Sequence, residues 1–414
     1  MRHQILILGF FLLTLNIKAQ EVITEITPNP FDTRVITTGV PFLLIAADAR
    51  AGSLGDMGVA TSVDAFSQQW NASKYAFSET KQGVGVSYTP YLTKLVKDIF
   101  LGSITYFNRI DEKSAFAASF RYFSLGDIEF VQDEFSIPLV QRPNEFTVDV
   151  SYALKLSQQF SMAVTMRYLN SDLRIPSEFT DTKAAGTFGV DISGYYQSEE
   201  EAFNSFNGRT RLGFAIQNVG PKFKYDEQGR ENFQPTTLRL GGGFDFIFDN
   251  YNKLGVTAEV TKLLVPTPPI RGTYRQYEDI NGNGEFDSDE DNLLAYDPNY
   301  IVEGKDDDVG FVKGMFQSFG DAPGGFSEEM KEITWALGAE YSYQDSFAFR
   351  AGYFNESDDK GARKFFALGA GFNYNIVGLD ISYLFSASKV PSPLENTLRF
   401  SLSFNIDREA YREY

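Results

Sequence analysis

Apolar and polar residues alternate one by one through most of the chain beyond residue 80. Residues 146–155 show the pattern well, because the even positions carry large apolar side chains and the odd positions carry small or polar ones. Successive side chains of a β-strand point to opposite faces, so such a segment has one apolar face and one polar face. The pattern therefore predicts strands that separate an apolar environment from a polar one.

The alternation recurs in fourteen segments, most of them close to the length of about 9–11 residues that a tilted strand needs to cross a bilayer. They lie at 82–92, 98–109, 113–130, 144–156, 159–174, 186–197, 208–218, 236–249, 252–264, 332–344, 346–356, 363–375, 377–387 and 396–406. The even number of antiparallel segments predicts an all-β transmembrane fold, namely a 14-stranded outer-membrane β-barrel over residues 81–406.

Short and long connections alternate along these segments. The connections after even-numbered segments are mostly tight, with 198–207 as the exception, whereas the others include several long ones. The long ones are 131–143, 175–185, 219–235 and 265–331. Bacterial barrels have short periplasmic turns and longer outer loops. The order therefore predicts that both termini are periplasmic and that the long acidic loops are extracellular.

The polar face of the segments carries charges of both signs. These residues are Arg121, Arg167, Arg211, Arg239, Arg350 and Arg399, together with Asp149, Asp245, Glu259, Glu340 and Asp380. A selective ion path would favour one sign more clearly. The mixture instead predicts a hydrogen-bonded polar interior that holds the barrel rigid.

Residues 1–19 have the pattern of a secretory signal peptide. Arg2 provides a basic start, residues 5–15 are mostly apolar, and Ala19 offers a small residue for cleavage. The apolar run is too short to be a spanning helix, and no later segment reaches about 18 unbroken apolar residues. The predicted organisation is a leader (1–19), a lead-in and hatch (20–80), the barrel (81–406) with its long loop 265–331, and a periplasmic tail (407–414).

Composition narrows the possible functions. The formal net charge is −18, which argues against binding of nucleic acid through its phosphates. The chain has no Cys, and His3, its one His, lies within the predicted leader. Ser-His-Asp and Cys-His catalysis are then excluded in the mature chain, as are zinc and haem sites with His or Cys ligands. Catalysis by carboxylates or by a Ser-Lys pair stays open, but no spacing in the sequence suggests it. We therefore expect a protein that is not an enzyme and has no catalytic residues.

Residues 40–77, called the hatch from here on, do not alternate. Small residues are frequent there, and Gly52, Gly55 and Gly58 recur at intervals of three, which suits close backbone packing in a confined space. Ser62 is predicted to cap a short helix that carries Phe66 and Trp70 one turn apart. The glycines do not match a nucleotide-binding fingerprint, because they do not follow a strand with the required spacing. We expect the hatch to plug the barrel.

The hatch also carries a set of motifs that resembles one protein family. The motif residues are Pro41, Asp48, Arg50, Gly52, Gly55, Asp56, Gly58, Trp70 and Asn71. On these residues the chain resembles the PorV family, the outer-membrane component of the type IX secretion system of Bacteroidetes and a relative of the fatty-acid transporter FadL. The family often has Pro after the Trp-Asn pair, where this chain has Ala72.

The resemblance implies a FadL-like barrel with an N-terminal hatch, and it implies partners. PorV-like proteins bind a large translocon barrel, collect secreted cargo by its C-terminal domain, and deliver it to a surface sortase complex for attachment to lipopolysaccharide. Two other functions stay open from the sequence: a FadL-type importer of hydrophobic small molecules, and an acyl hydrolase that modifies lipopolysaccharide. The missing His argues against the hydrolase.

One segment of the long loop matches a calcium-binding pattern. Residues 279–290 have oxygen-bearing side chains at positions 1, 3 and 5, Gly at position 6 and Glu at position 12. The predicted ligands of a structural Ca²⁺ are Asp279, Asn281, Asn283, Glu285 through its carbonyl, Asp287 and Glu290. The flanking residues are not convincingly helical, so the pattern predicts an isolated calcium loop; the alternative is a solvated acidic turn.

Overall fold

The fold was analysed in a computed structural model, which describes residues 21–31, 33–92, 96–131, 139–174, 183–226, 229–388, 395 and 397–408. The predicted leader (1–19) lies outside the described residues, as does most of the predicted tail (407–414). Within the described part, no helix is both long enough and apolar enough to span a bilayer.

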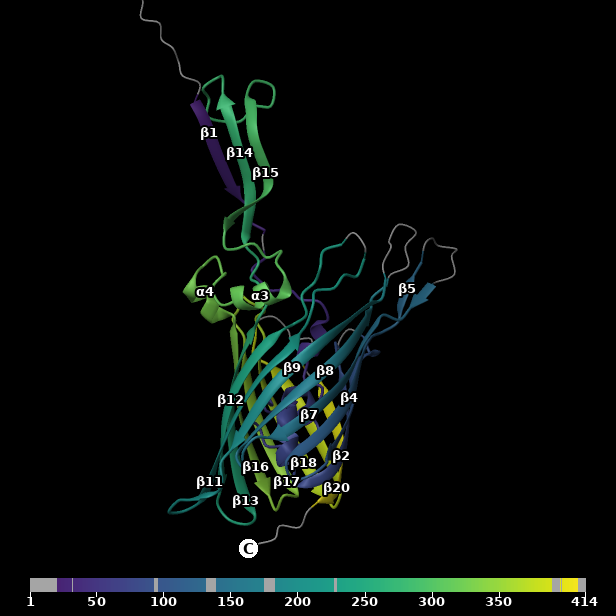
Figure 1. Ribbon diagram of the computed structural model, residues 1–414. Helices are drawn as coiled ribbons and strands as arrows, with labels where there is room; N and C mark the ends of the chain where they lie inside the picture. Colours follow the sequence, from purple (N-terminus) through teal and green to yellow (C-terminus); the bar gives the residue numbers. More distant parts are fainter. Residues whose placement is uncertain are drawn as a thin grey trace, which may run out of the picture. The chain divides into compact units, whose positions relative to one another are not determined.

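Fourteen antiparallel strands of the described chain form one closed sheet (Figure 1). Each strand pairs with its neighbour along the sheet, and pairing of β9 with β11 closes the barrel. The strands are β2 (Thr80–Pro90), β3 (Ile99–Arg109), β4 (Ser114–Leu125), β7 (Asn144–Lys155), β8 (Phe160–Asp172), β9 (Ala185–Gln197), β11 (Asn207–Val219), β12 (Thr237–Ile247), β13 (Asn252–Leu263), β16 (Ile333–Tyr343), β17 (Phe347–Asn355), β18 (Lys364–Tyr374), β19 (Val377–Ser386) and β20 (Leu398–Arg408). The 14-stranded antiparallel barrel predicted from the alternation is confirmed.

The barrel wall has an apolar outer face and a polar inner face, as predicted. On β7, the side chains of Val148, Val150 and Tyr152 are about half exposed on the outer face, whereas Thr147 and Asp149 are buried on the inner face. The same alternation continues around the barrel, where neighbouring outer aromatic rings such as Trp335, Tyr353 and Phe366 pack against each other. The outer surface of the barrel is therefore an apolar band suited to lipid.

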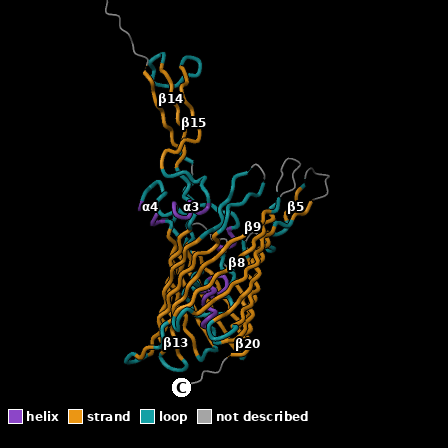
Figure 2. The backbone as a smooth tube through the Cα atoms, viewed as in Figure 1, coloured by secondary structure: helices purple, strands orange, loops and turns teal. Residues whose placement is uncertain are grey.

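The two ends of the barrel differ. At one end, called the turn end, the connections are mostly short; β10 (Glu201–Ala202) extends one of them by pairing with the start of β11. At the other end, called the loop end, the connections contain β5 (Ile128–Phe130), β6 (Leu139–Gln141), α3 (Phe311–Gln317) and α4 (Phe326–Lys331). Figure 2 shows short turns at one end and long loops with helices at the other.

The hatch lies inside the barrel, as the helices surrounded by strands in Figure 2 show. It consists of four short elements: η1 (Pro41–Leu44), α1 (Ala49–Ser53), α2 (Ser67–Trp70) and η2 (Ala72–Phe77). Most of its side chains are buried, and several clusters of buried apolar residues join it to the wall, two of them through stacked aromatic rings. Tyr75 stacks on Phe107 at a ring distance of 4.6 Å, and Phe42 stacks on Phe123 at 5.8 Å.

A second compact unit forms a separate three-stranded sheet. Its strands are β1 (Glu21–Pro28), β14 (Ile270–Asp279) and β15 (Asn292–Glu303), in the order β1-β14-β15. The sequence predicted only a lead-in before the hatch and one long loop at 265–331 that contains the calcium pattern. The eight residue pairs between β1 and β14 show that these two distant segments instead form one sheet.

The predicted helix cap at Ser62 is wrong. α2 begins at Ser67 and is preceded by Phe66, which provides no side-chain cap. The Ser62 hydroxyl instead accepts a hydrogen bond from Arg50 at 2.6 Å. The reason is that Arg50 is buried and needs acceptors, so it recruits the nearby hydroxyl into its own network.

Candidate functional site

Arg50 is the centre of an ion-pair network between the hatch and the wall. Its Nε and Nη2 atoms donate to the Glu340 carboxylate of β16 at 2.9 and 2.8 Å, and its Nη1 donates to Asp64 at 2.5 Å. Nη1 also donates to the carbonyl oxygen of Ser62 at 2.9 Å. Glu340 pairs in turn with Arg350 on β17. Arg50 therefore joins two parts of the hatch to two strands of the wall.

Asp48 and Trp70 lock the two short α-helices of the hatch together. Asp48 caps α1 by accepting the Ala51 N–H at 2.8 Å, and its second oxygen accepts the indole N–H of Trp70 at 2.8 Å. Gly58 lies against the Trp70 ring so closely that an added Cβ would sit 2.3 Å from a ring carbon. Gly58 also donates its N–H to Glu259 of β13 at 2.9 Å. These motif residues thus form one packed unit.

Asn71 and Pro41 begin the other two elements of the hatch. The Asn71 side-chain oxygen accepts the Ser73 N–H at 3.1 Å, and its amide donates to the carbonyls of Val59 and Gly194 at 2.9 Å each. Gly194 belongs to β9, so Asn71 also anchors the hatch to the wall. Pro41 is the first residue of η1, where its missing N–H costs nothing.

Asp56 and Gly52 pack the hatch against a buried arginine of β20, and Gly55 packs against the backbone of Tyr353 on β17. Nη1 of Arg399 donates to Asp56 at 2.7 Å, and the Arg399 side chain is almost completely buried. A Cβ at Gly52 would lie 2.1 Å from the same Nη1 atom, so a larger residue there would displace the guanidinium. Gly55 has a φ of 87°, which favours glycine. All nine predicted motif residues therefore belong to the hatch, and most of them contact the wall.

Polar contacts join the hatch to strands all round the barrel. Besides Glu259, Glu340, Arg399 and Gly194, the wall partners are Thr89 with Ala47 (2.9 Å), Ser151 with Gln68 (2.5 Å), Ser161 with Ser73 (2.8 Å), Arg211 with Ala60 (2.6 Å), Gln217 with Gln69 (2.8 Å) and Ser401 with Ala49 (2.8 Å). These residues lie on β2, β7, β8, β9, β11, β13, β16 and β20. The hatch is therefore fixed in the lumen rather than attached at one edge.

Most of the inward charges predicted from the sequence are paired within the wall, whereas Arg399 pairs with Asp56 of the hatch. Arg167 on β8 donates to Asp149 at 2.5 Å and to Asp191 at 3.2 and 2.9 Å, and Arg121 contacts Asp149 at 3.4 Å. The other pairs are Arg211 with Asp245 (2.7 Å), Arg239 with Glu259 (2.8 Å) and Arg350 with Asp380 (2.6 Å). The balance of signs gives a bonded interior, as predicted.

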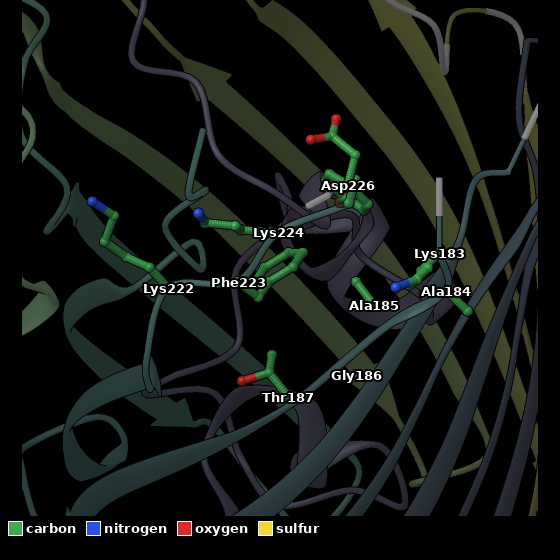
Figure 3. Close-up of a pocket in the computed structure, with 10 residues that line it drawn as sticks. Lys183, Ala184, Ala185, Gly186, Thr187, Lys222, Phe223, Lys224 and Asp226 are labelled. Atoms are coloured by element: carbon green, nitrogen blue, oxygen red, sulfur yellow. The ribbon is translucent and has the colours of Figure 1, made fainter. Parts of the chain in front are cut away.

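A cavity of about 570 Å³ opens at the loop end of the barrel, beside the start of β9. Its lining includes Lys183, Lys222, Lys224 and Asp226, so it is not an apolar pocket. Figure 3 shows the amines of Lys222 and Lys224 on one side and that of Lys183 on the other. Lys222 is already paired with Asp308 at 2.9 Å. The lysines therefore do not converge on one ligand position.

A buried charge network at the loop end was not found from the sequence. Lys262, near the end of β13, donates to Glu329 and Glu332 at 3.1 and 2.7 Å, and Lys360 donates to Glu328 and Glu332 at 2.7 and 2.9 Å. Glu328 also pairs with Arg34, just before the hatch. One signal was present: Lys262 is a charged residue at an apolar-face position of a predicted strand.

The network contains a carboxyl group that should respond to pH. Burial, helped by the charges of Glu329 and Glu332, raises the pKa of Asp321 to about 6, although the hydrogen bond from Thr267 acts in the opposite direction. Burial acts in the same direction on Glu328, but the hydrogen bonds from Lys360 and Gly324 and the charges of Lys360 and Arg34 together outweigh it, so the pKa of Glu328 is lowered. Because the folded pKa of Asp321 exceeds its unfolded value of 3.8, its ionisation destabilises the network as pH rises from about 4 to about 6.

We expect residues 321–332 to be better ordered near pH 5 than near pH 7, because Asp321 is then largely protonated while Glu328 keeps its charge. The measurement is the mobility of a spin label at position 326 as a function of pH. Asp321→Asn should remove the pH dependence between about 4 and 6. An unchanged titration in this variant would mean that another group is responsible.

The predicted calcium loop forms a tight, oxygen-rich turn within the three-stranded unit. Asp279 accepts the N–H groups of Gly282 and Gly284 at 2.6 and 2.8 Å, and Gly284 has the positive φ (77°) expected at position 6. The side chain of Asn281 donates to Glu290 at 2.8 Å, which brings positions 3 and 12 together. Asp291, which was not predicted, accepts the N–H groups of Ile280 and Asp287. The chain therefore folds back on the Asp279 carboxylate, and positions 3 and 12 of the pattern are in contact.

The remaining predicted ligands do not complete a carboxylate cage. Asn283 accepts the N–H of Glu285 at 2.7 Å, and Asp287 accepts that of Asp289 at 3.0 Å. Among the described residues, no three His, Cys, Asp or Glu side chains lie close enough together to hold a metal ion. The calcium site therefore stays a prediction.

Calcium, if it binds, should order this loop without changing the barrel. We expect millimolar Ca²⁺ to slow proteolysis within residues 279–290, with half-saturation in the range of about 10⁻⁴–10⁻³ M that is common for extracellular modules. Glu290→Gln should weaken this protection, whereas Asp358→Asn, in an exposed acidic loop of the barrel, should leave it unchanged. Equal cleavage with Ca²⁺ and with chelator would contradict the site.

Comparison with known proteins identifies a family. The model of the family described as type IX secretion system protein PorV matches residues 29–270, which is more than half of the chain and includes the whole hatch. No curated protein sequence matches this chain.

Several solved barrels are similar in structure. A FadL homologue from Pseudomonas aeruginosa has a TM-score of 0.43 at 12% identity, covering 87% of this chain and 99% of that one. The toluene transporter TodX from Pseudomonas putida has a TM-score of 0.44 at 11% identity, covering 90% and 99%. The toluene transporter TbuX from Ralstonia pickettii has a TM-score of 0.43 at 12% identity, covering 87% and 97%. Similarities of this size do not bear on what the chain binds.

Proposed function

Because the chain belongs to the PorV family of type IX secretion system proteins, we propose that it works in secretion by binding partners. In this proposal it binds the large translocon barrel, captures the C-terminal domains of cargo, and delivers the cargo to the surface sortase complex that attaches it to lipopolysaccharide. Its place is the outer membrane, where the turn end and both termini would be periplasmic and the loop end extracellular.

The observation that carries this proposal is the fixed hatch. Arg50, Asp56 and Asn71 join the hatch to three separate strands of the wall, β16, β20 and β9, and most of the hatch side chains are buried. Passage of a substrate through the lumen would require these buried pairs to break, which costs several kcal/mol for each one. A barrel built in this way is better suited to offer its outer surface and loops to other proteins.

Two further observations support partner binding over chemistry. The chain beyond the predicted leader has neither His nor Cys. The cavity at the loop end is lined by separated lysines, and it does not resemble the apolar pocket expected for import of a hydrophobic molecule. The FadL-type importer therefore stays as the alternative that the experiment must exclude.

The experiment is deletion of the gene followed by two assays on the same strain. We expect the culture medium and the cell surface to lose proteins that carry type IX C-terminal domains, while uptake of long-chain fatty acids and of toluene is unchanged. Expression of the intact chain should restore secretion. Normal secretion together with lost uptake would overturn the proposal in favour of the importer.

A further inference from the structure

Helix α4 buries charged side chains and exposes apolar ones. Glu328 and Glu329 are buried on its inner side, whereas the side chains of Phe326 and Met330, one turn apart, are 80% and 50% exposed. Phe319, in the turn before α4, is also exposed at 54%. A surface helix of a soluble protein normally buries its apolar residues and exposes its charges. The reversed arrangement indicates that the outer side of α4 does not face water.

The buried carboxylates of α4 neutralise a lysine on the outer face of the barrel wall. Lys262 of β13 has the same parity as Val260, which is exposed on the outer face, and the opposite parity to Glu259, which bonds the hatch inside. Its neighbours across the sheet are Leu238 and Ile333. Lys262 therefore stands on the lipid-facing side of the wall, close to its loop-end rim.

α4 and the turn before it cover this charge. Lys262 donates to Glu329 and Glu332, and the Phe319 ring lies 5.9 Å from its ammonium group. The Lys262 side chain is only 10% exposed as a result. The outer surface at this part of the rim therefore presents the apolar side chains of Phe319, Phe326 and Met330 in place of the Lys262 charge. These three residues are called the collar from here on. α4 lies at the loop end of the barrel, next to β16 (Figure 1).

The collar continues the apolar band of the wall. α4 leads into β16 after one residue, and the first outward side chains of that strand include Trp335 and Leu337, which are 43% and 50% exposed. Trp335 also begins the row of outer aromatic rings that packs against Tyr353. Aromatic girdles of this kind mark the interface of barrels with the membrane. The collar therefore adjoins a surface that already contacts lipid.

We propose that the collar is inserted in the headgroup and acyl boundary of the outer leaflet, so that α4 forms a short interfacial anchor at the rim of the barrel. The distribution of charged side chains in this segment is consistent with contact with lipid. All acidic side chains of residues 311–331 are buried, and the exposed charged residues of this segment are Lys313 and Lys331, the latter bonded to Asp359. Exposed apolar side chains together with exposed Lys or Arg, and without exposed acidic side chains, are typical of segments that lie on anionic lipid. The inference does not depend on the role in secretion.

The chain has no Cys, so single cysteines can be introduced and spin-labelled in the full-length protein without background. The test compares Phe326→Cys and Met330→Cys after reconstitution of the folded barrel, without other proteins, into vesicles of phosphatidylethanolamine and phosphatidylglycerol. Accessibility of each label is measured to oxygen, which partitions into lipid, and to a water-soluble nickel complex. Heat-modifiable migration on gels verifies that each variant is folded.

Two control positions on the same barrel give the accessibility ratios expected for a label in lipid and for a label in water. Val260→Cys reports the lipid-facing wall, and Lys224→Cys reports the water-exposed loop end. We expect the oxygen-to-nickel ratio at 326 and 330 to match that at 260 and to exceed that at 224 severalfold. Ratios at both collar positions equal to that at 224 would overturn the proposal. Such a result would point to a protein as the occupant of the collar, because no partner is present in these vesicles.

Discussion

Replacement of Arg50 by methionine is expected to destabilise the folded barrel by about 3–5 kcal/mol, because it leaves buried carboxylates without their partner. Arg50 bonds both oxygens of Glu340 as well as Asp64, and all three side chains are largely buried. Methionine keeps much of the volume but removes the charge. The measurement is the free energy of unfolding in urea, with the barrel reconstituted in lipid vesicles.

The matched control is an exposed ion pair of the same residue types. Arg142 pairs with Asp127 at 3.0 Å, but its side chain is 76% exposed. Arg142→Met should therefore change the free energy of unfolding by no more than about 1 kcal/mol. Equal losses in the two variants would contradict the structural role of the Arg50 network.

Replacement of Gly352 by valine is expected to push the hatch away from the wall. A Cβ at Gly352 would lie 2.2 Å from the Leu54 carbonyl carbon and 2.3 Å from the Gly55 nitrogen, and neither backbone atom can rotate away. Overpacking of this kind costs about 1–3 kcal/mol or more. We expect lower stability and an increase in ion conductance across planar bilayers, because the displaced hatch no longer fills the lumen.

A glycine with room for a side chain controls for the substitution itself. At Gly102 on β3 the nearest atom to an added Cβ is 3.7 Å away, which is an ordinary contact distance. Gly102→Val should keep both the stability and the low conductance of the unaltered barrel. If Gly352→Val also kept both, the close packing of the hatch against β17 would not be needed to close the lumen.

The barrel could be predicted because its strands lie between two different solvents. In β7, apolar Val148 and Val150 face outward and polar Thr147 and Asp149 face inward, and this difference is visible in the sequence. The β1-β14-β15 sheet has no such contrast, since β1 and β15 are exposed on both faces. Its pairing joins residues about 250 positions apart, which local periodicity cannot reveal.

The candidate site was only partly predictable for a related reason. The glycine spacing indicated close packing of the hatch, and the family resemblance identified the motif residues, but neither showed their partners. The contacts of Arg50 with Glu340 and of Asp56 with Arg399 are long-range and depend on which strands close the barrel. The Lys262 network likewise unites residues from β13, α4 and the β17–β18 loop.

The central claim is that this barrel works by holding other proteins, and co-isolation tests it most directly. The protein, tagged at a tolerated site, is isolated from outer membranes solubilised in mild detergent, and everything that remains bound is identified by mass spectrometry. The account predicts that a very large barrel protein and secreted proteins with type IX C-terminal domains remain bound. The same proteins should remain bound to the Arg142→Met variant. Isolation of the folded barrel without either, from cells that are actively secreting, would contradict the account.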